Sequence, residues 1–193
     1  MAALALTLLS GACAVRPVLS PQEQADVDRI QAYLDGLHGL RARFLQIGAD
    51  GATSSGIVWY EPGKLRIDYE QPARMEVVAT GTHLVAHRES DDSTTRIALS
   101  SNPLGLLLVP GLRLSGDITV TDIQRRAGVL QASLARTSNP AQGLLTLVFN
   151  DTGALQLVGL EAVDARRQRT SFHLIDPQAG LALDPGLFRP QAA

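Results

Sequence analysis

The sequence contains little cysteine, lysine or aromatic residue, and the shortages of cysteine and of aromatic residues exclude classes of protein. Of the 193 residues only Cys13 is a cysteine and only Lys64 is a lysine. A single cysteine excludes a disulfide framework and a cysteine-based zinc site. Aromatic residues make up 4% of the chain and the formal net charge is −2, so we expect no nucleic-acid partner.

The short motifs of common catalytic and nucleotide-binding sites are also missing, namely G-x-S-x-G, the P-loop and G-x-G-x-x-G. His83 and His87 lie four residues apart in a predicted strand, which separates them by about 13 Å, too far to share a metal ion. The spacing of Asp117, Asp122 and Glu161 does not define a catalytic pair. We therefore expect no enzyme, no catalytic residue, no metal site and no cofactor.

The N-terminus predicts export from the cytoplasm. Residues 2–14 are uncharged and mostly apolar, but this run is too short to span a membrane. It is typical of the apolar region of a signal peptide, with Ala12-Cys13-Ala14 as the cleavage site. The basic region that usually precedes it is missing, which suggests a start codon upstream of Met1. We assign residues 1–14 to a signal peptide and residues 15–193 to a single domain.

Cys13 leaves two alternatives open. Cleavage after Ala14 removes the cysteine and gives a soluble mature protein. Cleavage before Cys13 exposes the cysteine for lipidation and anchors the protein to a membrane. The preceding stretch LSGA favours the soluble form, because Ser10 stands where lipidated proteins usually have an aliphatic residue.

One amphipathic helix is predicted over residues 21–36. Ser20 is a suitable N-cap, Pro21 fits the first helical position and Glu23 completes a capping box. Apolar residues then recur at helical spacing. They are Val27, Ile30, Leu34 and Leu37.

The rest of the chain predicts short antiparallel strands. In the stretch VWYEPGKLRIDYEQP (58–72), apolar and polar residues alternate after a Pro-Gly turn, as expected for a hairpin with one buried face. Eleven such segments follow one another with turn signals between them, which indicates a meander that curls or closes. The predicted strands are 41–47, 55–61, 64–70, 75–79, 83–87, 94–99, 118–126, 129–136, 143–149, 154–163 and 169–175.

The segment NPLGLLLVPG (102–111) differs from its neighbours. It is very apolar, yet its prolines and its glycine make it a poor central strand. A short helix is the better prediction, with Asn102 as cap and Pro103 in the first position. Two roles stay open for it: a core helix that fills one mouth of a barrel, or a movable lid.

The chain resembles the family of periplasmic outer-membrane lipoprotein carriers, LolA. The resemblance depends on the order and spacing of short segments over roughly residues 20–190, not on one motif. The segments are Arg43-Phe44-Leu45-Gln46, Gly56 with the strand after it, Glu61-Pro62, the strand 65–69, Gln71-Pro72, the hairpin 77–84, Asn102-Pro103-Leu104, the strands from Asp151 to Leu174, and Phe188 with Pro190.

This resemblance implies a fold and a function. The fold is mainly β with helices: an open, incomplete antiparallel β-barrel, covered by an N-terminal helix and short lid helices around an apolar cavity. The implied protein is a soluble periplasmic chaperone of a Gram-negative bacterium, and a monomer. It would take acylated lipoproteins from an inner-membrane lipoprotein-releasing ABC transporter to an outer-membrane acceptor. The alternative is a membrane-anchored acceptor (LolB-like) or a lipoprotein-binding sensor of the same fold.

The resemblance also implies site residues, with an ordinary core as the alternative role. The acyl-chain cavity is predicted to comprise Phe44, Ile57, Trp59, Leu65, Ile67, Tyr69, Met75, Val77 and Leu84. The lid is predicted to comprise Pro103, Leu104, Leu106, Leu107 and Leu108. The family usually has an arginine before the turn proline, linked to holding the lid shut, whereas this chain has Glu61. We therefore expect Glu61 to be a different latch, paired with Arg113 or another arginine.

Overall fold

The computed structural model describes residues 18–80, 82–109 and 111–190. The predicted signal peptide and Cys13 lie outside these residues. The first element is the helix α1, Pro21–Asp35, which ends one residue before its predicted boundary. The capping box is formed: the Glu23 backbone N–H donates to the Ser20 hydroxyl at 3.3 Å, and the Ser20 N–H donates to the Glu23 carboxylate at 2.7 Å. These bonds satisfy backbone donors that have no partner within the helix.

All eleven predicted strands are present, with ends shifted by no more than three residues. They are β1 Leu40–Ile47, β2 Thr53–Glu61, β3 Lys64–Gln71, β4 Met75–Thr80, β5 His83–Arg88, β6 Ser93–Ala98, β7 Ile118–Arg126, β8 Val129–Arg136, β9 Gly143–Asn150, β10 Gln156–Asp164 and β11 Arg169–Gln178. Each hairpin is antiparallel, and the predicted β2–β3 hairpin pairs Tyr60 with Leu65 and Val58 with Ile67.

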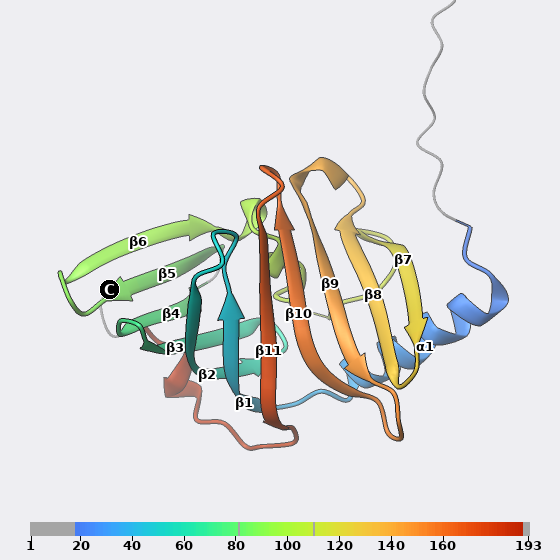
Figure 1. Ribbon diagram of the computed structural model, residues 1–193, viewed down its shortest axis with the longest axis horizontal. Helices are drawn as coiled ribbons and strands as arrows, with labels where there is room; N and C mark the ends of the chain where they lie inside the picture. Colours follow the sequence, from blue (N-terminus) through green and yellow to red (C-terminus); the bar gives the residue numbers. More distant parts are fainter. Residues whose placement is uncertain (1–17, 81, 110, 191–193) are drawn as a thin grey trace, which may run out of the picture.

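The strands form one curved sheet in the order β6-β5-β4-β3-β2-β1-β11-β10-β9-β8-β7. The first strand lies at the centre because β1 pairs with both β2 and β11. The end strands β6 and β7 do not pair with each other within the described part of the chain, so the sheet curls without closing (Figure 1). This arrangement confirms the predicted open, incomplete barrel.

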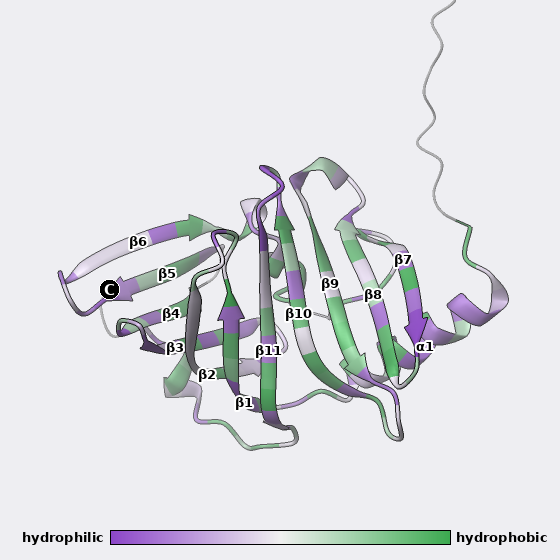
Figure 2. Ribbon diagram, in the orientation of Figure 1, coloured by the Kyte–Doolittle hydropathy of each residue, from purple (hydrophilic) through white to green (hydrophobic). Residues whose placement is uncertain are grey.

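The two halves of the sheet differ in how fully their concave faces are packed. Leu130, Leu134, Leu145, Leu147 and Phe149 on β8 and β9 are completely buried. Figure 2 shows hydrophobic residues along β8, β9 and β10, whereas β6 at the other end is mostly pale, with one hydrophilic band and a hydrophobic end. The β7–β10 half therefore contains a packed core. The concave face of the β2–β6 half is less completely filled by side chains.

The connection from β6 to β7 carries two short 3-10 helices, η1 Leu99–Ser101 and η2 Pro103–Leu106. As predicted, Asn102 caps η2: its side chain accepts from the Leu104 N–H at 2.9 Å, and Pro103 takes the first position. A Cβ on Gly105 would lie 2.3 Å from the Leu99 carbonyl oxygen, so only glycine allows η1 and η2 to pack this closely. Helix η2 lies inside the curve of the sheet, against β8, β9 and β10.

Two further 3-10 helices lie outside this connection, η3 Pro140–Gln142 and η4 Pro185–Phe188. The C-terminal segment brings η4 onto β3 and β4. Arg66 donates to the Leu187 carbonyl at 3.2 Å, and the Lys64 ammonium lies 5.5 Å from the centre of the Phe188 ring. These residues alternate with the inward-facing Leu65 and Ile67, so η4 covers the convex face of the sheet.

Candidate functional site

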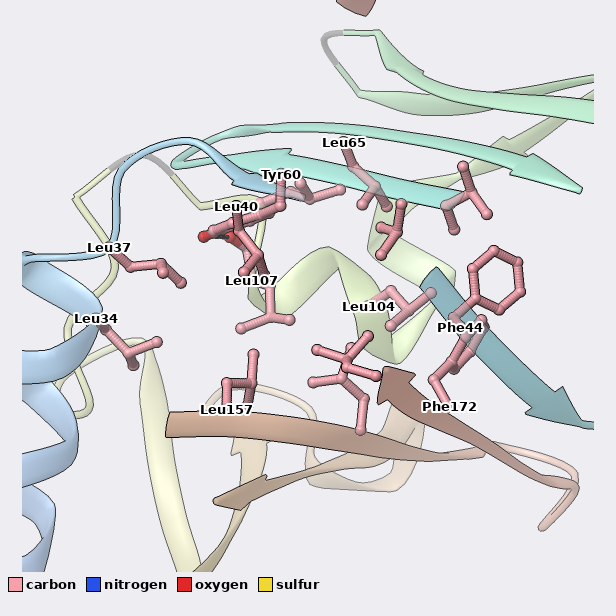
Figure 3. A pocket seen from close by; sticks show the side chains of 15 residues that line it. Leu34, Leu37, Leu40, Phe44, Tyr60, Leu65, Leu104, Leu107, Leu157 and Phe172 are labelled. Atoms are coloured by element: carbon pink, nitrogen blue, oxygen red, sulfur yellow. Dashed lines mark hydrogen bonds between the residues drawn. The ribbon is translucent and has the colours of Figure 1, made fainter. Parts of the chain in front are cut away.

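A small apolar cavity lies inside the curve of the sheet, with a volume of about 50 Å³. It is enclosed by the β1–β3 wall, the β10–β11 wall, the end of α1 and the helix η2 (Figure 3). Its lining is aliphatic and aromatic. The lining residues are Leu34, Leu37, Leu40, Phe44, Val58, Tyr60, Leu65, Ile67, Leu104, Leu107, Leu108, Leu157, Leu160, Phe172 and Leu174. We call this space the inner cavity.

A second and larger space of about 430 Å³ lies beside it, under the β3–β6 part of the sheet. Ile67, Leu104 and Phe172 line both spaces, so the two are neighbours. The larger one has a mixed lining, and we call it the outer compartment. Its other lining residues are Gln46, Tyr69, Met75, Val77, Leu84, Ala86, Arg88, Ser93, Thr95, Ile97, Asn102, Pro103, Ala162, Asp164, Gln168 and Thr170.

The inner cavity is too small for a long apolar chain in this conformation. Its volume of 50 Å³ is well below the roughly 300–1,000 Å³ of pockets that enclose drug-sized ligands. A fatty-acyl chain of roughly a dozen methylene groups needs several times more space. The side chains of Leu104, Leu107 and Leu108 take up the room that such a chain requires. The segment 104–108, which comprises the end of η2 and the two residues after it, therefore plugs the site, and an apolar ligand would have to displace its leucines.

The predicted lid residues divide by direction. Leu107 and Leu108 face the inner cavity, Leu104 faces both spaces, and Pro103 borders the outer compartment. Leu106 is buried but lines neither space; it borders a small pocket beside Arg136 and Gly143 at the β8–β9 side. The segment thus uses Leu106 as its attachment to the core and the other three leucines as the plug.

A buried hydrogen bond ties this plug to the sheet. The Tyr60 hydroxyl on β2 donates to the Leu107 carbonyl oxygen at 3.0 Å. Burial raises the pKa of Tyr60 to about 12, so the phenol keeps its proton and remains a donor at neutral pH. Leu107 is the C-cap residue of η2. The bond therefore holds the end of the helix against the β1–β3 wall.

The predicted pairing of Glu61 with Arg113 is not present. Glu61 forms an ion pair with Lys64 at 2.9 Å across its own turn, and Arg113 pairs with Asp35 of α1 at 3.0 Å. The prediction relied on the sequence position of Glu61 at the turn. In the structure the neighbouring Tyr60 points inward to η2, because successive residues of a strand point to opposite faces.

Two of the predicted cavity residues lie on the wrong face. Ile57 and Trp59 line neither space, whereas their neighbours Val58 and Tyr60 line the inner cavity. Trp59 lies 5.9 Å from the Arg66 guanidinium, on the convex face. The four residues Ile57 to Tyr60 are all apolar or aromatic, so alternation gave no sign of which pair faces inward.

The other predicted cavity residues lie on the concave face, in two groups. Phe44, Leu65 and Ile67 line the inner cavity, and Tyr69, Met75, Val77 and Leu84 line the outer compartment. The prediction missed Leu34 near the end of α1 and Leu37 just after it, and it missed the opposite wall with Leu157 and Phe172. The helical spacing of apolar residues had included Leu34 and Leu37, but nothing local in the sequence relates these two residues to β2.

The described residues contain no group of three or more histidine, cysteine or acidic side chains placed to hold a metal ion. His83 is exposed, and the His87 ring lies 3.3 Å from the Thr94 hydroxyl.

No helix within residues 18–80, 82–109 and 111–190 is long and apolar enough to cross a membrane.

The fold and the site define a half-open antiparallel sheet that encloses an apolar cavity plugged by its own leucines. The chain belongs to the family of the outer membrane lipoprotein carrier protein LolA, whose family model matches residues 35–191. It is 28% identical over 180 residues to an outer-membrane lipoprotein carrier protein of Methylococcus capsulatus, covering 88% of this chain and 85% of the relative.

Two solved structures are similar at low identity. One is an uncharacterized conserved protein from Thermus thermophilus, with 9% identity, a TM-score of 0.49 and coverage of 88% of this chain and 95% of that one. The other is a LolA superfamily protein from Nitrosomonas europaea, with 11% identity, a TM-score of 0.48 and coverage of 86% and 97%.

Proposed function

We propose that this protein is a periplasmic carrier that binds the acyl chains of lipoproteins inside the curve of the sheet. The observation that supports this most directly is the plugged inner cavity. An interior lined almost entirely by aliphatic groups has no chemistry for catalysis, but it lowers the free energy of a hydrocarbon chain removed from water. Family membership and the relative named as a lipoprotein carrier agree with this cargo.

The energetics suit a carrier that must release its cargo. Burial of an acyl chain contributes roughly 0.8 kcal/mol per methylene group. Even a partly enclosed chain therefore stays bound to the carrier and does not escape into water. Displacing Leu104, Leu107 and Leu108 from the cavity offsets part of this gain. The contacts have no direction, so many lipoproteins fit, and transfer to a more apolar acceptor proceeds downhill without a reaction at the carrier.

The cellular route follows from this proposal. The soluble protein would receive cargo from an inner-membrane lipoprotein-releasing ABC transporter and deliver it to an outer-membrane acceptor, acting as a monomer in the periplasm of a Gram-negative bacterium.

The test uses a triacylated cysteine peptide as the probe. Purified protein without residues 1–14 should keep this lipopeptide soluble, comigrate with it as a one-to-one complex in gel filtration, and give it up to added outer-membrane vesicles. The same peptide without acyl chains is the control and should not bind. If the acylated peptide at micromolar concentration elutes apart from the protein, the proposed function is wrong.

The hydrogen bond from Tyr60 to Leu107 predicts that loss of the Tyr60 hydroxyl changes the rate of lipopeptide loading. Tyr60→Phe leaves the buried Leu107 carbonyl without its donor, which disfavours the closed lid by about 1–2 kcal/mol. We expect lipopeptide loading to become about 10-fold faster, since 1.4 kcal/mol corresponds to a factor of ten. Stopped-flow fluorescence with a lipopeptide that carries an environment-sensitive dye measures this rate.

Glu61→Gln is the matched comparison. Glu61 contacts Lys64 at the surface, so its neutralisation should change the loading rate by less than twofold. If Glu61→Gln loads faster and the loading rate of Tyr60→Phe is unchanged, then Glu61, and not Tyr60, holds the plug closed.

A further inference from the structure

A polar pair stands on the wall between the two spaces. The Tyr69 hydroxyl on β3 donates to the Gln46 side-chain carbonyl on β1 at 2.6 Å. Both residues line the outer compartment, and neither lines the inner cavity. The pair therefore lies at the point where the aliphatic lining ends.

Aromatic contacts fix the position of this pair. The Tyr69 ring packs edge-on against Phe44, with 5.2 Å between ring centres, and Phe44 lies 5.8 Å from Phe172. Phe44 lines the inner cavity and Phe172 lines both spaces. Three aromatic rings in contact with one another thus form the border between the apolar and the polar lining. These contacts give the amide of Gln46 a defined position beside the mouth of the cavity.

The hydrogen bond leaves the amide N–H donors of Gln46 unused. Tyr69 occupies the carbonyl of the Gln46 amide, and burial raises the pKa of Tyr69 to about 12, so the phenol stays a donor at neutral pH. The amide nitrogen of Gln46 carries two N–H donors. No acceptor among the described residues bonds to this nitrogen, and Gln46 borders the outer compartment. The Gln46 amide therefore offers two N–H donors to a ligand in this position.

We propose that the Gln46 amide donates to an ester carbonyl of the acylated glyceryl group of the cargo. This inference rests on the proposed function, because it names the part of a lipoprotein that stops at the cavity mouth. An ester carbonyl accepts hydrogen bonds and cannot donate, so it is a suitable partner for the two N–H groups of the Gln46 amide. The hydrocarbon then extends past Phe44 into the inner cavity, and the peptide leaves through the outer compartment. Tyr69 is a positioning residue that orients the amide.

Two lipopeptides test this assignment: a diacylglyceryl-cysteine peptide with two palmitoyl esters, and the same peptide with two hexadecyl ethers. They share chain length and peptide, but the ether lacks the carbonyl oxygens. We expect the wild-type protein to bind the ester about 5-fold more tightly, the effect of one hydrogen bond of about 1 kcal/mol. Gln46→Met keeps the length of the side chain and removes the donors, so it should lower ester affinity to the ether level and change ether affinity less than about twofold.

Tyr69→Phe provides an independent measurement, because it keeps the ring contacts with Phe44 and removes the hydroxyl. It should reduce the ester preference while leaving ether affinity unchanged. Gln24→Leu on the exposed face of α1 is the control for loss of an amide and should keep the full preference. If folded Gln46→Met retains the ester preference, the assignment is wrong and the carrier function stands. If the wild-type protein binds neither lipopeptide, the proposed function fails and this inference fails with it.

Discussion

Leu104→Glu should abolish lipopeptide binding while the protein remains folded. Leu104 lines both the inner cavity and the outer compartment and is only partly buried, so a carboxylate there can stay in contact with water as long as no cargo is bound. An acyl chain that enters the cavity would cover this charge. Covering an unpaired carboxylate costs several kcal/mol, so we expect affinity to fall about 100-fold or more.

The chain offers a matched control on the other face of the sheet. Leu45 lies on β1 with 38% of its surface exposed and lines neither space, because its neighbours Phe44 and Gln46 point inward. Leu45→Glu adds the same charge and should leave affinity within about twofold, as expected for a solvated surface group. Fluorescence titration with the triacylated peptide measures both variants, and circular dichroism checks that each is folded.

Leu104→Met separates charge from shape, because methionine is apolar and adapts to irregular gaps. We expect it to bind the lipopeptide nearly as well as the wild-type protein. Equal affinity of Leu104→Glu and wild type would mean that cargo does not enter past η2, and the plugged cavity would then be an ordinary core.

The strands were predictable because their signals are local. The β2–β3 hairpin has a Pro-Gly turn and strict alternation from Lys64 to Tyr69, and the structure places Leu65 and Ile67 inward as that alternation requires. The helix α1 was predictable for the same reason, since Ser20, Pro21 and Glu23 form a cap within four residues of one another. Such features need no knowledge of distant contacts.

The face of β2 was not predictable, because its inward and outward residues are equally apolar. Val58 and Tyr60 face the cavity, while Trp59 lies beside Arg66 on the convex side. Trp59 is half-buried there, against the Arg66 guanidinium. A single-residue shift in register reverses every assignment on such a strand.

The lid contact was not predictable either, because it joins residues 47 positions apart. The sequence marked both partners, Tyr60 as part of a strand and Leu107 as part of an apolar run, without relating them. The glycine in that run had no local explanation, and the structure gives one: Gly105 allows η2 to approach the Leu99 carbonyl. Contacts of this kind arise only when the sheet has curled around η2.

A buried ion pair gives the largest expected effect on stability. Asp26 of α1 is completely buried, and Arg125 of β7 contacts both of its carboxylate oxygens, with the Nε atom donating at 2.6 Å. Arg125→Met removes this partner and leaves, among the residues that the structure describes, only the longer contact from Arg29 at 3.4 Å. A buried carboxylate without adequate compensation should lower the free energy of unfolding by about 3 kcal/mol, or roughly 6–12 °C in Tm for a domain of this size.

The loss should be unequal for the two partners, since their surroundings differ. The Arg125 side chain is 42% exposed and can turn to water, whereas Asp26 has no access to it. Asp26→Asn should therefore cost less than Arg125→Met, and the double variant should be more stable than Arg125→Met alone, because it no longer buries an unpaired charge. Arg126→Met, at an exposed neighbour on the same strand, is the control and should stay within about 0.5 kcal/mol of wild type. Urea unfolding measures all four variants. Equal losses in Arg125→Met and Arg126→Met would show that the ion pair does not hold α1, the helix that carries Leu34 of the cavity wall, to the sheet.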